Sequence, residues 1–100
     1  MKHVILYTMQ GCPHCAEMKN MLKENRIIFS ERDIDEYQEE YDLFVEATDN
    51  EFIPAFMLLE MNMISESEIS EKPKRVKLLA PDRDFQELEE ALEMVKKFLN

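Results

Sequence analysis

Apolar residues near the start of the chain follow first a strand-like and then a helical pattern. Residues 4–7 form a continuous apolar run, which is typical of a strand buried on both faces of a sheet. A helix is expected next, because Pro13 suits a first helical position and Asn25 suits a stop. The apolar stripe of this helix consists of Cys15, Met18 and Leu22. Residues 27–34 then predict a second strand, so this part of the chain indicates a β-α-β unit.

A second helix is predicted after residue 34. Asp35 and Gln38 have the spacing of a capping box, in which two side chains satisfy free N–H groups at a helix start. The apolar face of the helix consists of Tyr37, Tyr41, Phe44 and Ala47 or Thr48. Residues 49–50 are suited to end it. This helix is therefore expected to lay one face on the sheet.

The second half of the chain predicts two more strands and a last helix. Residues 54–59 read as a strand with a proline at its start, and residues 76–79 read as another. The polar segment 60–75 between them is expected to be an extended hairpin or an insertion. Asp84 and Glu87 again have capping-box spacing. The stripe of the last helix consists of Phe85, Leu88, Leu92, Val95 and Leu99. The predicted order is β-α-β-α-β-β-α.

Size and charge narrow the class of protein. One hundred residues match one hydrophobic core, so we expect a single domain over residues 1–100, and we expect a monomer. The chain carries 22 acidic and 12 basic residues, a net charge of −10, which argues against nucleic-acid binding. The apolar run at 4–7 is too short for a signal peptide or a membrane span. We therefore expect a cytoplasmic protein without a membrane partner.

The two cysteines are spaced as a redox pair, Cys12-Pro13-His14-Cys15. Cys12 falls at a predicted helix N-terminus, where free backbone N–H groups and the helix dipole favour a thiolate, so we expect it to be the attacking sulfur. Cys15 lies about one turn further on the apolar stripe and is expected to be the resolving sulfur. Pro13 and a protonated His14 are expected to tune the thiolate.

Other interpretations of these residues remain open. A Cys-x-x-Cys pair can bind zinc, but zinc prefers four ligands, and only His3, His14 and carboxylates are left to supply the others. Two inert buried cysteines are a second alternative, which the exposed strand-to-helix junction at residues 11–13 disfavours. His14 taken alone could be a plain surface histidine at a helix start, but the flanking cysteines favour the tuning role. We expect no metal and no tightly bound cofactor.

Residues 8–15, together with Ile53 and Pro54, resemble the glutaredoxin family within the thioredoxin fold. The resemblance implies an α/β fold with a four-stranded mixed sheet and helices on both faces. It implies that Pro54 is a cis-proline facing the cysteines and that the Ile53 backbone pairs with a peptide or glutathione. It also implies a substrate groove to which Gly11 and Asp84 contribute. Tyr7, at the end of the first strand, is a further candidate for the groove, although a tyrosine in such a place more often belongs to the core.

Three features depart from the family pattern. Met9 stands where the family usually has Lys or Arg, and His14 stands where it usually has Tyr. Residues 80–84 replace a pair of glycines, a small residue and two acids, so that only Asp84 matches. Arg83 would repel the amino group of glutathione or pair with one of its carboxylates, and it is equally compatible with a solvated helix start.

The sequence thus predicts a thiol-disulfide oxidoreductase that reduces protein disulfides or glutathione mixed disulfides through Cys12 and Cys15. Its substrate would be a disulfide-containing protein such as ribonucleotide reductase, and glutathione or thioredoxin reductase would recharge it. Two alternatives stay open. One is a binding module with a thioredoxin-like groove and incidental cysteines, and the other is a net oxidant with a dithiol tuned by His14.

Overall fold

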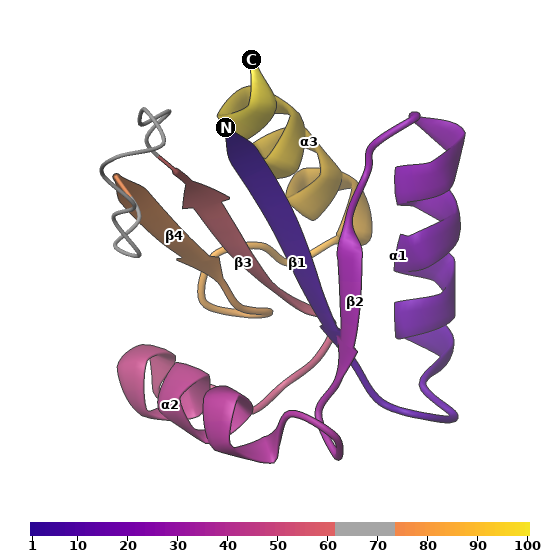
Figure 1. The fold of residues 1–100 in the computed structure, drawn as a ribbon. Helices are drawn as coiled ribbons and strands as arrows, with labels where there is room; N and C mark the ends of the chain where they lie inside the picture. The colour runs from indigo at the N-terminus through magenta and orange to yellow at the C-terminus, as the bar shows by residue number, and fades with distance from the viewer. Residues whose placement is uncertain (62–73) are drawn as a thin grey trace.

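The computed structural model describes residues 1–61 and 74–100 and confirms the predicted order of elements (Figure 1). Most of the expected insertion at 60–75 lies outside the described residues. The elements are β1 (Lys2–Thr8), α1 (Pro13–Glu24), β2 (Ser30–Asp33), α2 (Gln38–Thr48), β3 (Ala55–Glu60), β4 (Arg75–Leu79) and α3 (Leu88–Leu99).

The four strands form one mixed sheet in the order β2-β1-β3-β4. The apolar β1 lies inside the sheet, parallel to β2 and antiparallel to β3, which in turn pairs antiparallel with β4. A strand inside the sheet has both faces covered, which explains why residues 4–7 are apolar without alternation. The expected four-stranded mixed sheet is confirmed.

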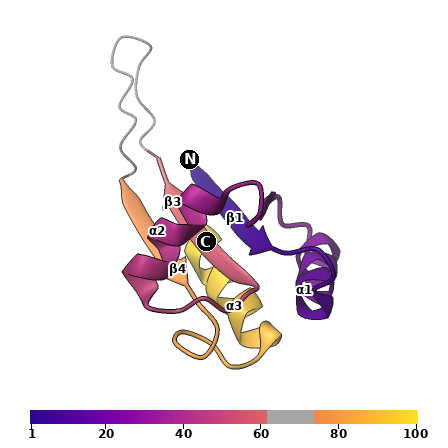
Figure 2. The ribbon, with the colours of Figure 1, turned by 90° about the horizontal axis from the view of Figure 1, so that it is seen from below.

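Helices cover both faces of this sheet (Figures 1 and 2). The sheet therefore separates the hydrophobic core into two clusters, one on each face. Successive strand residues point to opposite faces, so Val4 and Leu6 pack with α1 and α3, whereas Ile5 and Tyr7 pack with α2. The first cluster also contains Met18, Leu22, Phe56, Leu58, Leu79, Phe85, Ala91, Leu92, Val95 and Phe98. The second also contains Tyr41, Phe44, Ala55 and Ala80. The three-layer α/β arrangement follows from this pattern.

The expected start of the second strand was wrong by three residues. Residues 25–27 are used to close α1: the Arg26 N–H donates to the Lys23 carbonyl and the Ile27 N–H donates to the Leu22 carbonyl, both at 3.0 Å. Arg26 adopts a left-handed φ of 58° at this stop. Pairing with β1 therefore begins only at Ser30. Ile28, which the apolar pattern placed in the strand, is 92% exposed.

The capping box predicted at Asp35 and Gln38 was also wrong. The residue that precedes α2 is Tyr37, and its side chain makes no capping hydrogen bond. The Asp35 N–H donates instead to the Asp33 side chain (2.8 Å), so this stretch is a turn stabilised by Asp33. Tyr37 was expected on the buried stripe but is 42% exposed, with the Arg32 guanidinium over its ring.

The last helix starts one turn later than predicted. Its capping box is formed by Glu87 and Glu90, not by Asp84 and Glu87. Asp84 lies in the preceding loop, where its carboxylate accepts a hydrogen bond from the Ala80 N–H (2.8 Å). Phe85 is buried ahead of the helix, edge-on to Phe56. The loop between β4 and α3 is thus anchored by one apolar and one polar side chain.

Candidate thiol-disulfide site

A short turn carries the chain from the end of β1 into α1. The Cys12 N–H donates to the Met9 carbonyl (3.3 Å), and Gly11 adopts a φ of 77°, a left-handed conformation that costs glycine little. Cys12 is then the N-cap of α1 and Pro13 is its first residue, as predicted. This turn fixes Cys12 at the edge of the sheet where β1 ends.

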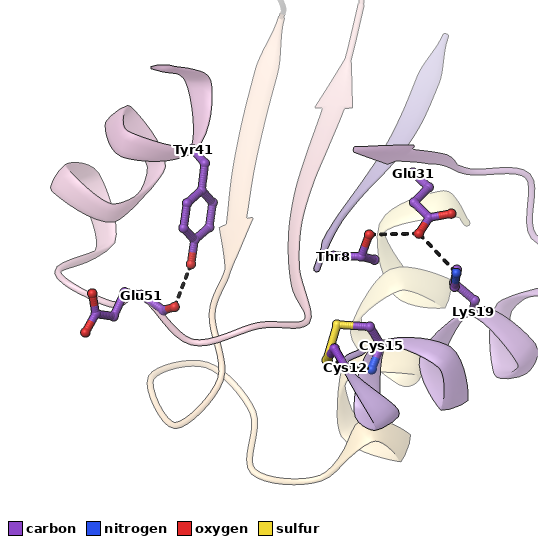
Figure 3. Close-up of a disulfide and its surroundings, with 7 residues drawn as sticks. All are labelled: Thr8, Cys12, Cys15, Lys19, Glu31, Tyr41 and Glu51. Carbon is purple, nitrogen blue, oxygen red and sulfur yellow. Dashed lines mark hydrogen bonds and ion pairs between the residues drawn. A yellow bond between two sulfur atoms is a disulfide. The ribbon is translucent and has the colours of Figure 1, made fainter. Parts of the chain in front are cut away.

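Cys12 and Cys15 are joined by a disulfide, with their Cα atoms 5.2 Å apart (Figure 3). Cys15 is buried on the apolar stripe of α1, at 2% exposure, whereas Cys12 is only half-buried. The Cys15 N–H donates to the Cys12 sulfur at 3.1 Å. Because the two environments differ, an external sulfur can approach Cys12 more readily than Cys15.

A second loop lies beside the first turn of α1, next to His14. The Ile53–Pro54 peptide bond is cis, as the family resemblance implied. Ile53 and Pro54 share a cavity of about 150 Å³ with His14 and with residues 85–88. His14 is exposed, whereas Pro54 is buried. The structure therefore brings His14, Ile53 and Pro54 together at one small, mostly apolar cavity.

The predicted groove residues do not all lie at the surface. Gly11 lines a second cavity, of about 390 Å³, on the β2 side of the disulfide. The placement of Tyr7 in a groove was wrong: its side chain is 0% exposed and packs against Tyr41 and Phe44 under α2. Asp84 is half-buried, and its carboxylate is engaged by the Ala80 N–H and by Arg83.

Tyr7 instead anchors the core beneath α2. Its hydroxyl donates to Glu40 at 3.0 Å, and Glu40 is also paired with Arg32. Burial, with the Glu40 contact in second place, raises the pKa of Tyr7 far above its ordinary value. Tyr41, whose hydroxyl donates to the Glu51 carbonyl (2.6 Å), has its pKa raised mainly by burial as well. Both phenols therefore stay protonated at neutral pH.

A polar network on the wall of the larger cavity escaped the sequence analysis. The Thr8 hydroxyl and the Lys19 ammonium both donate to one Glu31 carboxylate oxygen, at 2.8 and 3.0 Å (Figure 3). The Thr8 hydrogen bond, followed by that of Lys19, lowers the pKa of Glu31. These residues come from β1, α1 and β2, so only the parallel pairing of β1 with β2 brings them together. The network therefore cannot be predicted from the spacing of residues along the sequence.

Residues 1–61 and 74–100 are the part of the chain that the structure describes. That part of the chain contains no group of three or more His, Cys, Asp or Glu side chains arranged to hold a metal ion. None of its helices is long and apolar enough to cross a membrane.

A dithiol pair at the start of a helix, beside a cis-proline on a four-stranded mixed sheet, defines a thioredoxin-like thiol-disulfide oxidoreductase site. The glutaredoxin family model matches residues 4–57, a stretch that contains most of β1, the cysteine pair and the cis-proline. The chain belongs to the glutaredoxin family. Comparison with curated proteins gave no match, and neither did comparison with solved structures.

Proposed function

We propose that this glutaredoxin-family protein reduces disulfides in proteins, or mixed disulfides of proteins with glutathione, through its Cys-Pro-His-Cys dithiol. The observation that carries the proposal is the unequal exposure of the two sulfurs: Cys12 is half-buried at the helix start, and Cys15 is buried behind it. A nucleophile that is more accessible than its resolving thiol is the arrangement that two-step exchange requires.

The first step is attack by the Cys12 thiolate on one sulfur of the substrate disulfide. A bond forms between the Cys12 sulfur and that sulfur, the substrate disulfide breaks, and the departing thiolate takes a proton from solvent. Backbone N–H groups at the start of α1 favour the thiolate, and the Cys15 N–H, 3.1 Å from the Cys12 sulfur, is one of them. Pro13 begins the helix, and a protonated His14 adds positive charge.

The second step releases the substrate. Cys15 loses its proton and attacks the Cys12 sulfur, which forms the Cys12–Cys15 disulfide and expels the second substrate thiolate, which then takes up a proton. The substrate has gained two electrons and the dithiol has lost two. Two molecules of glutathione or one turnover of thioredoxin reductase return these electrons to the protein.

The substrate segment is held between the turn at Gly11 and the loop at Ile53 and Pro54. In this proposal the Ile53 backbone pairs with the extended substrate, as the resemblance to the family implies. Asp84 contributes through the loop it anchors, because its carboxylate holds the Ala80 N–H. A cytoplasmic protein disulfide, such as that of ribonucleotide reductase, fits this proposal, with the oxidoreductase acting as a monomer.

Single cysteine variants test the proposal directly. With dithiothreitol as reductant, the wild-type protein is expected to accelerate reduction of a peptide disulfide above the rate with dithiothreitol alone. Cys12→Ser is expected to abolish this acceleration. Cys15→Ser keeps the nucleophile and loses the resolving thiol, so it is expected to accumulate a mixed disulfide that mass spectrometry detects. Full activity of Cys12→Ser would refute the proposal. A mixed disulfide on Cys15 of that variant would reverse the assigned roles.

A further inference from the structure

An exposed aromatic side chain lies next to the proposed substrate-pairing residue. Phe52 is 58% exposed, although it directly precedes Ile53 and the cis-proline. It lines a hollow of about 320 Å³ at the end of α2, which we call the Phe52 hollow; the other lining residues are Val45, Asp49, Asn50 and Glu51. Single exposed apolar side chains are common on protein surfaces. Phe52 differs from the others because it lines a hollow and directly precedes the proposed substrate-pairing residue.

Phe52 is exposed on a loop that is held in place from three directions. The Phe52 N–H donates to the Asn50 side chain at 2.9 Å. The Asn50 amide donates in turn to the Pro81 carbonyl at 2.5 Å, and the Tyr41 hydroxyl donates to the Glu51 carbonyl at 2.6 Å. The hollow is therefore a preformed feature, which lowers the ordering cost of binding. The loop runs from Glu51 toward the disulfide before it enters β3 (Figure 3).

The charged lining of the hollow is acidic. Asp49 and Glu51 are both exposed, and none of the described residues that line the hollow is basic. An apolar surface rimmed by carboxylates suits a lysine or arginine side chain, whose aliphatic stem can cover the Phe52 ring while its charged head reaches the carboxylates. The ring face itself attracts a cation within about 6 Å.

Three cations in the described part of the chain are paired with acids. The pairs are Lys19 with Glu31, Arg32 with Glu40 and Arg83 with Asp84. The position three residues before Cys12, which is Met9, carries no charge. A ligand with an excess of carboxylates therefore gains little from these cations, whereas a ligand with an unpaired cation finds the carboxylates of the Phe52 hollow.

We propose that the Phe52 hollow is a specificity site for a lysine or arginine side chain of a protein substrate. This proposal rests on the proposed function, because the basic residue is delivered by the same extended segment that pairs with Ile53. Two residues of an extended chain span about 7 Å, so the proposal places the basic residue a few positions from the substrate half-cystine. The disulfide of free glutathione, a peptide without Lys or Arg, leaves the hollow empty.

The test compares peptides that differ only in charge. Each peptide has one Cys, joined by a disulfide to the neutral thiol 2-mercaptoethanol, and has Lys, Gln or Glu at two positions on either side. The reduced protein is mixed with each in a single turnover, and the second-order rate constant is measured. The Lys peptide is expected to react about fivefold faster than the Gln peptide, which is the scale of an exposed charge pair. The Glu peptide is expected to be the slowest.

Two variants assign this preference to the hollow. The double variant Asp49→Asn and Glu51→Gln removes both charges, and Asn tolerates the left-handed φ of 54° at position 49. It is expected to abolish the Lys preference and leave the Gln peptide unaffected. The matched control is Glu24→Gln with Glu93→Gln, two exposed acids outside the hollow. It makes the same change in net charge and is expected to retain most of the preference.

The contribution of the ring is tested by Phe52→Ala. It is expected to lower the rate constant for the Lys peptide about threefold, the loss expected for a modest cation-ring contact. Ile28→Ala, which removes an apolar side chain that is 92% exposed, is its control and should change nothing. High salt, about 1 M, where the Debye length is about 3 Å, should remove most of the charge preference and spare the ring contribution.

The outcomes separate the two proposals. Equal rate constants for the Lys, Gln and Glu peptides, or a preference that survives in the double variant, would overturn the Phe52 site and leave the dithiol mechanism standing. Failure of the reduced protein to react with any disulfide would instead remove the proposed function, and the site with it.

Discussion

The Asn50 side chain donates to the Pro81 carbonyl at 2.5 Å and so ties the loop before β3 to the loop before α3. Its oxygen also accepts the Phe52 N–H at 2.9 Å. Asn50→Ala is expected to lose both contacts and to destabilise the fold by about 1–3 kcal/mol, measured by denaturant unfolding. It should also lower the rate constant for peptide disulfides, because Ile53 loses its support.

Asn50→Asp separates these two bonds. It keeps the oxygen that accepts the Phe52 N–H and replaces the donor to Pro81 with an acceptor. If the bond to Pro81 matters more, Asp should be at least as harmful as Ala. A wild-type rate constant in the Asp variant would show that the tie between the loops is not needed for reaction.

Burial in the first core cluster predicts a large effect at one leucine and a small effect at another. Leu22 on α1 is 0% exposed in the core cluster that α1 and α3 form with the sheet, so Leu22→Ala is expected to cost about 2–5 kcal/mol of stability. Leu43 on α2 is 67% exposed, and Leu43→Ala is expected to change stability by less than about 0.5 kcal/mol. Denaturant midpoints measure both. Equal losses would contradict the assigned burial.

The hydrogen bond from Thr8 to Glu31 is expected to make the stability of the fold depend on pH in the acid range. Its hydroxyl helps to lower the pKa of Glu31, so that contact contributes stability above the ordinary carboxyl range and loses it as pH falls through the lowered pKa. Thr8→Val removes the donor with little change in shape. Because the Glu31 side chain is 41% exposed, the loss at neutral pH is expected to be only about 1 kcal/mol.

The measurement for Thr8 is the free energy of unfolding between acid and neutral pH, together with the Glu31 carboxyl titration followed by NMR. The variant should titrate at higher pH than the wild type and should show a smaller loss of stability in acid. A Glu31 titration that does not move in Thr8→Val would contradict the interpretation. Lys19→Met is the companion variant that removes the second donor.

The raised pKa values of Tyr7 and Tyr41 are expected to cause a loss of stability at alkaline pH. Their folded pKa values are raised above the unfolded value of about 10, so the unfolded chain releases these protons first. The associated stability is fully present below pH 10 and declines as pH rises above it. Tyr7→Phe is expected to cost about 1 kcal/mol at neutral pH, because the hydrogen bond to Glu40 is lost. The difference in unfolding free energy between the wild type and this variant is expected to shrink as pH rises.

Tyrosinate absorbance and unfolding curves, recorded over the same alkaline range, check this prediction. In the wild type, full ionisation should coincide with unfolding. Titration of every tyrosine near pH 10 in a chain that stays folded would show that the burial of Tyr7 does not control its ionisation.

Much of the fold could be predicted from local pattern. The apolar run at 4–7, the proline at the start of α1 and the stripes of three helices each depend on residues close together in sequence. Errors occurred where several polar residues competed for one role. The Asp35 N–H donates to the Asp33 side chain, whereas the predicted capping box had it donate to Gln38. The capping box of α3 is formed by Glu87 and Glu90. Hydrogen-bond spacing alone does not decide between such neighbours.

In the candidate site, too, some residues could be predicted from local spacing and others could not. Cys12 and Cys15 could be assigned from spacing, because one helical turn connects them. The Thr8, Lys19 and Glu31 network could not, since it depends on the register between two parallel strands. Tyr7 was placed in the groove from its position at a strand end, but which face a side chain takes depends on strand register and on the helix packed there. Phe52 gave no periodic signal at all.

Both chain ends lie at the edge of the sheet away from the cysteines, where the Lys2 ammonium approaches the Asn100 carbonyl at 3.5 Å (Figure 1). A handle attached at either end would therefore leave the sulfurs open to solution. The molecule can be immobilised on an electrode or a bead through that edge, with Cys12 facing the bulk liquid. Electrons and substrates would then meet it from one known side.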